Sequence, residues 1–329
     1  MNTPPGNADA QPRIVVVGSI NLDLVVKCDR LPQPGETLTA QSFDEIPGGK
    51  GANQAVAAAR LGASVAMIGR LGNDAFGRTL RQGLIAAGVE VTHVLDTSDC
   101  ESGVALITVD DRGENTIAVV GGANARLTPA DVEASEPAFR GAKVLLLQLE
   151  TPLAAILSAV RLARRHGLKV IVDPAPAVDS LPAELLAADV LCPNETEASR
   201  LCGYPVDNSQ QARRAAEWLR DQGAAVAIVK RGEHGVVVSA QENAQNKPCR
   251  EFASYRVNAI DATGAGDAFA AALGVALAEA TPLGDAIPFA CAAGAVAASR
   301  AGALPAMPTR DDVMRLMASQ SPTVSNLET

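Results

Sequence analysis

The chain has 329 residues, of which 47% are hydrophobic and 20% are charged, and its formal net charge is −9. This length and composition are typical of one large globular α/β domain. The negative charge, with no run rich in lysine or arginine, argues against binding to nucleic acid or to an anionic membrane surface.

Six cysteines are spread along the chain without any C-x-x-C pair. In a chain of this length we expect them to be reduced thiols. No segment has the roughly 18 uninterrupted apolar residues of a membrane helix, and residues 1–12 lack the apolar core of a signal peptide. We therefore expect a cytoplasmic protein with no membrane partner.

Residues 1–12 are rich in Pro, Asn and Gly, and residues 318–329 are polar, so we expect both to be disordered tails. The segment RIVVVGSI at 13–20 predicts a buried strand. It is followed by GANQAVAAARLG at 51–62, which predicts a helix closed by Gly62.

Four further short apolar runs are separated by segments of helix length. They are VLLLQL at 144–149, LKVIV at 168–172, DVLC at 189–192 and AVAIVK at 225–230. Such runs are typical of parallel strands covered on both faces. The expected fold class is therefore α/β, a three-layer α/β/α core over residues 13–317 with a mostly parallel central sheet.

Two stretches, at about 21–43 and 102–122, interrupt this alternation. The second contains two alternating runs around a hairpin turn centred on Asp110 to Gly113. We expect the two stretches to form a small β-sheet that acts as a lid at the carboxyl edge of the core strands, where open α/β sheets bind ligands.

Two familiar nucleotide-binding loops are absent. In DEIPGGKGA, Asp44 stands where a Walker A loop needs its first glycine, and Gly51 where it needs Ser or Thr. In GAGDAF, Phe269 stands where the dinucleotide fingerprint needs its third glycine. The three histidines are scattered, which argues against catalytic zinc.

A Gly-Ala-Gly turn at 264–266 leads into an alanine-rich helix that Asp267 is expected to open. Successive N–H groups at a helix start, together with the helix dipole, form a cradle for an anion. Asp267 fits such a cradle if it accepts a proton from a hydroxyl that attacks the bound phosphoryl group. The alternative is a simple helix cap. We expect the helix dipole to keep Asp267 ionised.

These segments resemble the ribokinase family of carbohydrate and nucleoside kinases. DATGAGDAF at 261–269 is similar to its carboxy-terminal signature and GGKGANQAVAAARLGA at 48–63 to its amino-terminal signature. The resemblance runs from about residue 13 to residue 317. It also includes GSINLD at 18–23, PGET at 34–37, QLE at 148–150, DPAPA at 173–177 and PNETEA at 193–198.

The resemblance implies ATP-dependent phosphorylation of D-ribose at O5, with Asp267 as general base and Gly264, Ala265 and Gly266 as the anion hole. The residues that it implies for sugar binding are Asn21, Asp23, Gly49, Lys50, Asn53, Glu150 and Asp267. Carboxylates and carboxamides suit neighbouring hydroxyls because they offer paired hydrogen bonds. Asp23, Lys50, Asn53 and Glu150 each also have a plainer interpretation as a turn, loop or helix-start residue.

For ATP and its Mg²⁺, the resemblance implies the residues Asn194, Glu197, Lys230, Gly232, Gly235, Gly266 and Cys291. Asn194 and Glu197 can equally be helix-start residues, and the glycines an ordinary hairpin. Mg²⁺ is expected to be held mainly by ATP oxygens and water. The resemblance also implies a site for an activating K⁺ ion. Its ligands would come from Asp261, Thr263, Ala297, Arg300 and Gly302, while Ala306 stands where family members can have a serine ligand.

The resemblance also implies a homodimer formed through the lid, whose edges and apolar face need cover. Several alternatives stay open: a deoxyribokinase, a fructokinase or a nucleoside kinase of the same family. A catalytically silent regulator that binds nucleotide or sugar is the alternative from another class, and a Rossmann oxidoreductase ranks below it.

Overall fold

The structure is a computed structural model that describes residues 11–240, 249–320 and 324–327. Its main sheet has ten strands in the order β14-β13-β12-β11-β10-β9-β8-β1-β4-β5. The strands from β11 to β5 are parallel, and β12, β13 and β14 add antiparallel pairs at one edge. The strands are β1 (Arg13–Val17), β4 (Ser64–Gly72), β5 (Glu90–Thr97), β8 (Val144–Leu147), β9 (Lys169–Val172), β10 (Val190–Leu191), β11 (Val226–Lys230), β12 (Val236–Ala240), β13 (Cys249–Phe252) and β14 (Val324–Leu327).

Helices cover both faces of this sheet, because its strands are apolar on both sides. In β1, Ile14 and Val16 belong to one hydrophobic cluster and Val15 and Val17 to the other. The first cluster packs against α1 (Lys50–Arg60), α2 (Ala75–Ala86), α9 (Ala265–Ala278), α10 (Leu283–Ala298) and α11 (Arg310–Ser319). The second packs against α3 (Pro129–Ala134), α4 (Glu136–Phe139), α5 (Leu153–His166), α6 (Ala183–Leu186), α7 (Glu195–Cys202) and α8 (Ser209–Asp221). The expected three-layer α/β/α core is confirmed.

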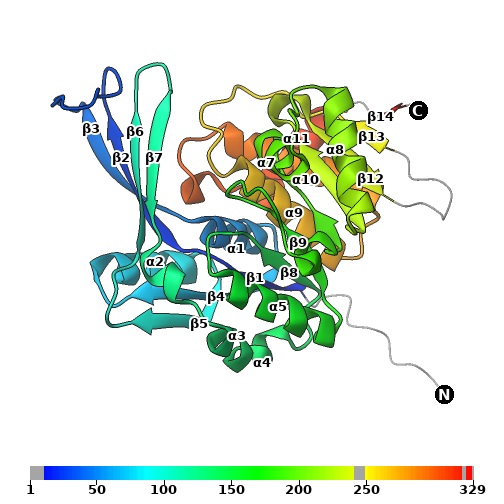
Figure 1. Ribbon diagram of the computed structural model, residues 1–329, viewed down its shortest axis with the longest axis horizontal. Coiled ribbons are helices and arrows are strands. Elements are labelled where there is room, and N and C mark those ends of the chain that lie inside the picture. Colours follow the sequence, from blue (N-terminus) through cyan, green and yellow to red (C-terminus); the bar gives the residue numbers. More distant parts are fainter. Residues whose placement is uncertain (1–10, 241–248, 321–323, 328–329) are drawn as a thin grey trace.

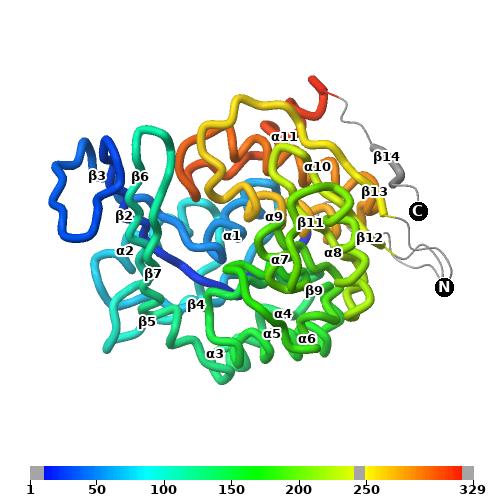
Figure 2. The backbone as a smooth tube through the Cα atoms, turned by 45° about the horizontal axis from the view of Figure 1, so that its top comes forward, coloured from blue at the N-terminus to red at the C-terminus, as the bar shows by residue number. Residues whose placement is uncertain are grey.

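A second sheet of four strands, in the order β3-β2-β6-β7, projects from the body (Figure 1). We call it the lid. Its strands are β2 (Asn21–Lys27), β3 (Ser42–Gly48), β6 (Gly103–Val109) and β7 (Asn115–Val120). The turn between β6 and β7 closes with hydrogen bonds between Asp110 and both Gly113 and Glu114, as expected. Figure 2 shows the lid standing apart from the body in a second view.

The structure differs from two expected boundaries. The lid does not stop at residue 43, because β3 continues to Gly48 and pairs with β2 along its whole length. We missed this strand because its Pro47 and two following glycines look like a loop. The carboxy-terminal stretch is also more regular than a tail: α11 reaches Ser319, and β14 pairs with the backbone groups that β13 would otherwise leave open. Residues 1–10 of the other expected tail lie outside the described residues.

Candidate active site

Polar residues collect where the parallel strands end. Ser19 and Asn21 follow β1, Glu150 follows β8, and Asp173 follows β9, while Lys230 is the last residue of β11. Because these strands are parallel, their carboxyl ends meet at one edge of the sheet. The amino-terminal ends of α1 and α9 meet there too, because Asn53 and Gln54 of α1 are hydrogen-bonded to Asp267 of α9. The lid stands over this edge (Figure 1).

The start of α1 packs directly on the backbone that follows β1. A Cβ atom on Gly51 would lie 2.6 Å from the carbonyl carbon of Gly18, and one on Gly49 would lie 2.6 Å from the backbone nitrogen of Asn21. Gly49 also has φ of +89°, a backbone conformation that favours glycine. The glycines of GGKG therefore allow close contact with the strand end, which puts Lys50 at the helix start.

Asp267 lies in the first turn of α9, at the third helical residue. The helix begins at Ala265, behind Gly264 with φ of +75°, so our expectation that Asp267 opens it is wrong by two residues. Both carboxylate oxygens of Asp267 accept amide hydrogens, one from Asn53 Nδ2 at 2.9 Å and one from Gln54 Nε2 at 3.1 Å. The carboxylate is thereby held in one orientation.

Burial raises the pKa of Asp267 to about 6, and the charge of Asp173 adds to the rise, while Lys50 opposes it. We expected the helix dipole to keep this carboxylate ionised. Burial of the side chain works against ionisation, because it removes the carboxylate from water. A base with a pKa near neutrality is ionised at pH 7 and still accepts a proton readily.

Acidic groups surround Lys50 under the lid. Burial lowers the pKa of Lys50, but the charges of Asp267, Asp173 and Glu150 outweigh it and raise this pKa above its ordinary value. Burial, with repulsion from Glu150 and Asp267, raises the pKa of Asp23 to about 7. Glu150 itself accepts a hydrogen bond from the Ser19 hydroxyl and one from the Lys50 backbone N–H at 3.3 Å. The result is a cluster of hydrogen-bond acceptors around one cation.

Asn124, a residue that sequence reasoning missed, anchors the point where the chain enters the lid. Its side-chain oxygen accepts the Ile20 N–H at 2.9 Å, and its nitrogen donates to Asn21 Oδ1 at 2.7 Å. Asn124 is almost completely buried, and its partners lie more than 100 residues away in the sequence. No local pattern identifies such a residue.

Gln54, Gln148 and Asp173 form a buried network that was also missed. Gln54 Nε2 lies 3.3 Å from Asp173 Oδ2, and Gln54 Oε1 accepts a hydrogen bond from Gln148 Nε2 at 2.6 Å. The other oxygen of Asp173 accepts from Lys230 Nζ at 2.7 Å. Gln148 and Asp173 lie within QLE and DPAPA, two segments that resemble the family. The sequence therefore pointed to these segments, but we predicted no role for either residue.

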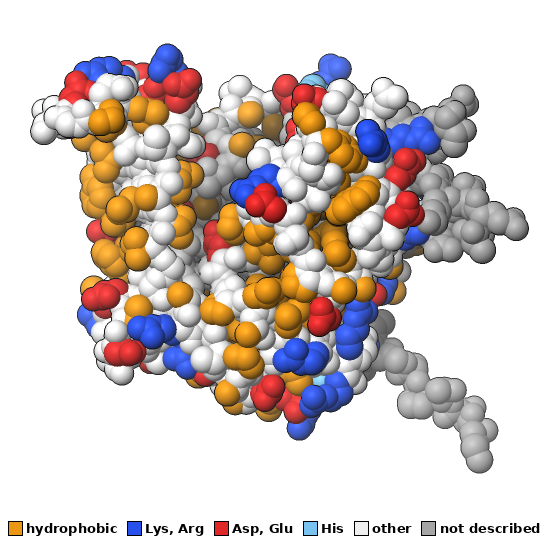
Figure 3. All heavy atoms as spheres, in the orientation of Figure 1, with side chains coloured by type: hydrophobic (Ala, Val, Ile, Leu, Met, Phe, Trp, Pro, Cys, Tyr) orange, Lys and Arg blue, Asp and Glu red, His pale blue; other side chains and the backbone are white. Residues whose placement is uncertain are grey.

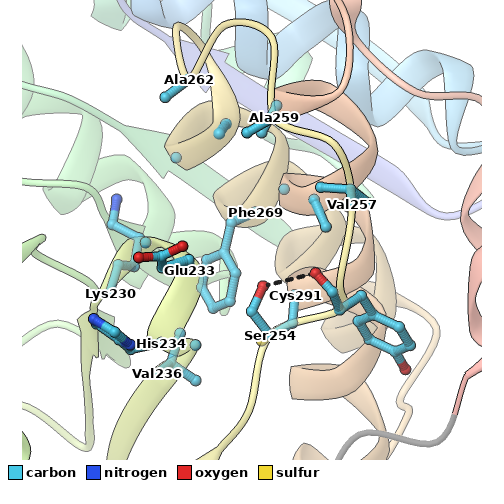
Figure 4. Close-up of a pocket in the computed structure, with 18 of the residues that line it drawn as sticks. Lys230, Glu233, His234, Val236, Ser254, Val257, Ala259, Ala262, Phe269 and Cys291 are labelled. Atoms are coloured by element: carbon cyan, nitrogen blue, oxygen red, sulfur yellow. Dashed lines mark hydrogen bonds between the residues drawn. The ribbon is translucent and has the colours of Figure 1, made fainter.

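A cavity of about 810 Å³ opens beside the start of α9. Figure 4 shows it between the β11–β12 hairpin, with Glu233 and His234, and the segment that contains Val257 and Ala259. The wall contains Phe269 and is otherwise largely made of small residues. Six residues expected at a nucleotide line it: Asn194, Lys230, Gly232, Gly235, Gly266 and Cys291.

Glu197 does not line the cavity. It forms a reciprocal cap with Asn194 at the start of α7: Asn194 Oδ1 accepts the Glu197 N–H at 2.8 Å, and Glu197 Oε2 accepts the Asn194 N–H at 2.7 Å. The plainer interpretation of N-x-x-E as a helix start therefore holds. Burial raises the pKa of Glu197, and the nearby charge of Lys230 opposes this rise.

The residues expected around a monovalent cation lie together on the other side of the cradle. The two oxygens of Asp261 accept the N–H groups of Thr263 and Gly302, each at 2.9 Å. Burial alone would raise the pKa of Asp261, but these hydrogen bonds lower it below its ordinary value. Ala297 and Arg300 lie in the same turn, where the Arg300 N–H donates to the Ala297 carbonyl oxygen.

Among the described residues, no group of three or more His, Cys, Asp or Glu side chains is placed to hold a metal ion. A cation on this part of the chain must therefore be held mainly by other oxygen atoms. Hard cations accept such ligands, including backbone carbonyl groups, water and phosphate oxygens. Asp261, with an ionised carboxylate beside several carbonyl groups, has the chemistry of such a site.

Residues 11–310 match the family model described as "pfkB family carbohydrate kinase". The chain belongs to this family. A ribokinase from Haemophilus influenzae is 40% identical over 305 residues, which cover 92% of this chain and 98% of that protein. A deoxyribokinase from Salmonella typhi is 38% identical over 257 residues, or 78% and 82% of the two chains.

The fold matches solved structures from the same family. The structure of Arabidopsis thaliana ribokinase complexed with ribose and ATP has a TM-score of 0.83 and 35% identity, and it covers 93% of this chain and 99% of that one. The dinucleotide-binding alternative thus has no support, since the matching family consists of carbohydrate kinases. No helix in the described part of the chain is long and apolar enough to cross a membrane.

Proposed function

We propose that this carbohydrate kinase transfers the γ-phosphoryl group of ATP to O5 of D-ribose. One observation carries the proposal: the buried carboxylate of Asp267 is bonded to Asn53 and Gln54 and directly follows Gly266, which lines a cavity large enough for a nucleotide. Relatives named ribokinase, at 35–40% identity over most of the chain, support ribose as the acceptor. The ribokinase complex with ribose and ATP supports the pairing of these two substrates.

On the lid side, the sugar is proposed to bind to Asn21, Asp23, Gly49, Lys50, Asn53 and Glu150. Asn53 Oδ1 is buried and has no hydrogen-bond partner among the described residues, so it can accept from a sugar hydroxyl. Asp23 and Glu150 supply further acceptors, and Lys50 offsets their charge. Hydroxyl groups satisfy these acceptors without adding a further negative charge to the pocket.

Asp267 is proposed to take the proton of the sugar hydroxyl as that oxygen attacks phosphorus. The N–H groups of Gly264, Ala265 and Gly266, at the start of α9, are proposed to face the transferred phosphoryl group. The Ala265 N–H also donates to the Ala262 carbonyl oxygen at 3.2 Å. Gln54 and Asn53 keep the carboxylate turned toward the hydroxyl. The lid excludes water, which would otherwise compete with the sugar for the phosphoryl group.

On the cavity side, Asn194, Lys230, Gly232, Gly235 and Cys291 are proposed to line the ATP site, with Gly266 at the phosphates. The glycines let the backbone of the hairpin approach the nucleotide, and the Lys230 ammonium attracts its phosphates. Magnesium, bound mainly by phosphate oxygens and water, neutralises developing charge during transfer. Glu197 is proposed to act through Asn194, which its carboxylate holds at the start of α7.

A potassium ion is proposed to bind at Asp261, with oxygens of Thr263, Ala297, Arg300 and Gly302. When bound, it supplies positive charge beside the cradle. Ala306 cannot donate a side-chain oxygen, so activation should be weaker than in a site with serine there. Potassium replaced by choline at constant ionic strength should lower the rate, while an unchanged rate would contradict the site.

We further propose a homodimer formed through the lid. Phe43, Leu106 and Ile117 have 57%, 49% and 56% of their surface exposed, and Figure 3 shows hydrophobic side chains along the lid. Apolar faces of this kind mark interaction surfaces. Light scattering at micromolar concentration should give twice the 33.7 kDa of the chain, and a monomer would contradict the proposal. A cytoplasmic location agrees with the six free cysteines.

The decisive experiment is ADP release from ATP with D-ribose, 2-deoxyribose, fructose and adenosine as acceptors. We expect the highest kcat/KM with ribose. A higher kcat/KM with another acceptor would leave the kinase mechanism standing but change the assigned substrate. 2-Deoxyribose is included because a deoxyribokinase is 38% identical to this chain. Absence of turnover with any acceptor would favour the silent regulator.

A further inference from the structure

A buried ion pair borders the anion cradle. Lys230 Nζ lies 2.7 Å from Asp173 Oδ1, and the two side chains are 12% and 3% exposed. A Cβ atom built on Gly266 would lie 3.2 Å from Lys230 Nζ, so the ammonium group is adjacent to the cradle. A carboxylate this close to an anion site weakens anion binding by repulsion. Asp173 therefore has a role other than binding the nucleotide.

The second oxygen of Asp173 leads to the base. Gln54 Nε2 lies 3.3 Å from Asp173 Oδ2 and 3.1 Å from Asp267 Oδ1. An ionised carboxylate only accepts hydrogen bonds, so the Gln54 amide must turn its nitrogen toward both acids. Its oxygen then faces Gln148 Nε2, at 2.6 Å. Gln54, Gln148 and Asp173 are at most 2% exposed, so water does not compete for these bonds.

We propose that Asp173 and Gln54 are positioning residues that hold Lys230 and Asp267 in a fixed relation to each other. Lys230 contacts the transferred phosphoryl group, and Asp267 receives the proton. The network aligns these two groups before the substrates bind. This inference rests on the proposed kinase reaction. We call Lys230, Asp173, Gln54 and Asp267 the alignment network.

The two carboxylates have complementary tasks in this network. Asp173 uses one oxygen for Lys230 and the other for Gln54, so it connects a cation to an amide. Asp267 receives one bond from Gln54 and one from Asn53, both from α1. An amide in place of Asp173 presents only one oxygen, so it keeps one of its two links and loses the other.

The test compares Asp173→Asn, Gln54→Met and the double variant in ATP-dependent phosphorylation. We expect each single change to lower kcat by about 10- to 100-fold, because misplaced reacting groups slow the chemical step. KM for ATP and for the sugar should change by less than about threefold. The double variant should lose far less than the product of the single losses, because both changes break one network.

Asp131→Asn is the matched control. It removes the acid from another partly buried ion pair, Asp131 with Arg70 at 2.7 Å, between α3 and β4. It should lower stability and leave kcat within about twofold of wild type, because it is not part of the network. Should Asp173→Asn fail to fold, Gln54→Met still tests the proposal, since it leaves both charges of the ion pair in place.

Single-variant kcat values within about threefold of wild type would overturn the inference, as would losses that multiply in the double variant. So would losses that only follow the fraction of unfolded protein, measured by circular dichroism. The acceptor is whichever sugar wild type uses best, so a wrong substrate assignment leaves the network testable. If wild type phosphorylates none of the acceptors, the proposed function and the network both fail.

Discussion

Under the lid, the site consists of carboxylates, amides and the ammonium of Lys50. The cavity beyond Gly266 is lined by many glycine and alanine residues and a few larger apolar ones, and polar side chains such as Lys230 and Glu233 are fewer there. On the polar side, hydrogen bonds fix the carboxylates of Asp267 and Glu150. On the apolar side, the backbone and the shape of the wall define the space. Substitutions on the two sides should therefore change different kinetic constants.

The largest effect should come from Asp267→Asn on the polar side. Removing a general base lowers the rate by about 10²- to 10⁴-fold. We expect kcat to fall by this amount, with KM for ATP little changed, since the cavity wall is intact. Steady-state kinetics with both substrates check the result. A kcat above a tenth of wild type would mean that Asp267 is not the general base.

Gly49→Ala tests the close packing on the polar side. The substituted residue would have φ of +89° and a Cβ atom 2.6 Å from the Asn21 nitrogen. We expect the free energy of unfolding to fall by about 1–3 kcal/mol and KM for the sugar to rise. Urea unfolding measures the first effect. Gly83→Ala in α2, with nothing within 4 Å of its Cβ atom, is the control and should stabilise by about 0.5–1 kcal/mol.

Cys291→Phe tests the apolar side. The larger ring should narrow the cavity and raise KM for ATP about tenfold, in line with an overpacking cost of about 1–3 kcal/mol. KM for the sugar should stay nearly constant. Cys291→Ala is the control and should change both values little. Equal increases in KM for ATP and KM for the sugar would contradict the claim that the two sides bind different substrates.

The smallest predicted effect is the pH dependence of the wild type. Asp267 must be ionised to accept a proton, and its pKa is raised to about 6. As pH falls through 6, the base becomes protonated, so kcat/KM for the sugar should be about half its plateau value near pH 6 and fall further below it. Asp23, with a pKa of about 7, can steepen this fall. A constant kcat/KM from pH 8 to pH 5 would contradict the assignment.

On the polar side, the sequence predicted some residues and missed others. Asp267 lies next to a glycine-rich turn that signals a helix start, so a local pattern identified it, whereas Lys50 and Asn53 were predicted from the resemblance to the family. Asn124, Gln54 and Asp173 were missed because their roles depend on partners about 50 to more than 200 residues away. The raised pKa of Asp267 was missed for the same reason, since burial is a property of the assembled core.

The fold followed from apolar runs, because continuous hydrophobic segments of strand length have few alternatives in an α/β protein. Strand β3 was the exception. Its sequence SFDEIPG contains mostly polar or turn-forming residues, and its strand structure comes from pairing with β2. Tertiary pairing of this kind overrides local propensity.

Two connections of the lid adjoin the residues that we propose to bind the sugar. Only Gly18, Ser19 and Ile20 separate β1 from β2, and Gly49 alone separates β3 from α1. The other two connections are residues 98–102, between β5 and β6, and Gly121, after β7. A swing of the lid would turn at all four connections, and the first two adjoin Asp23 and Lys50. A fluorescent dye attached at the lid tip, for example at Arg112, would then report sugar binding as a change in emission. The molecule thus offers a scaffold for a reagentless sugar biosensor.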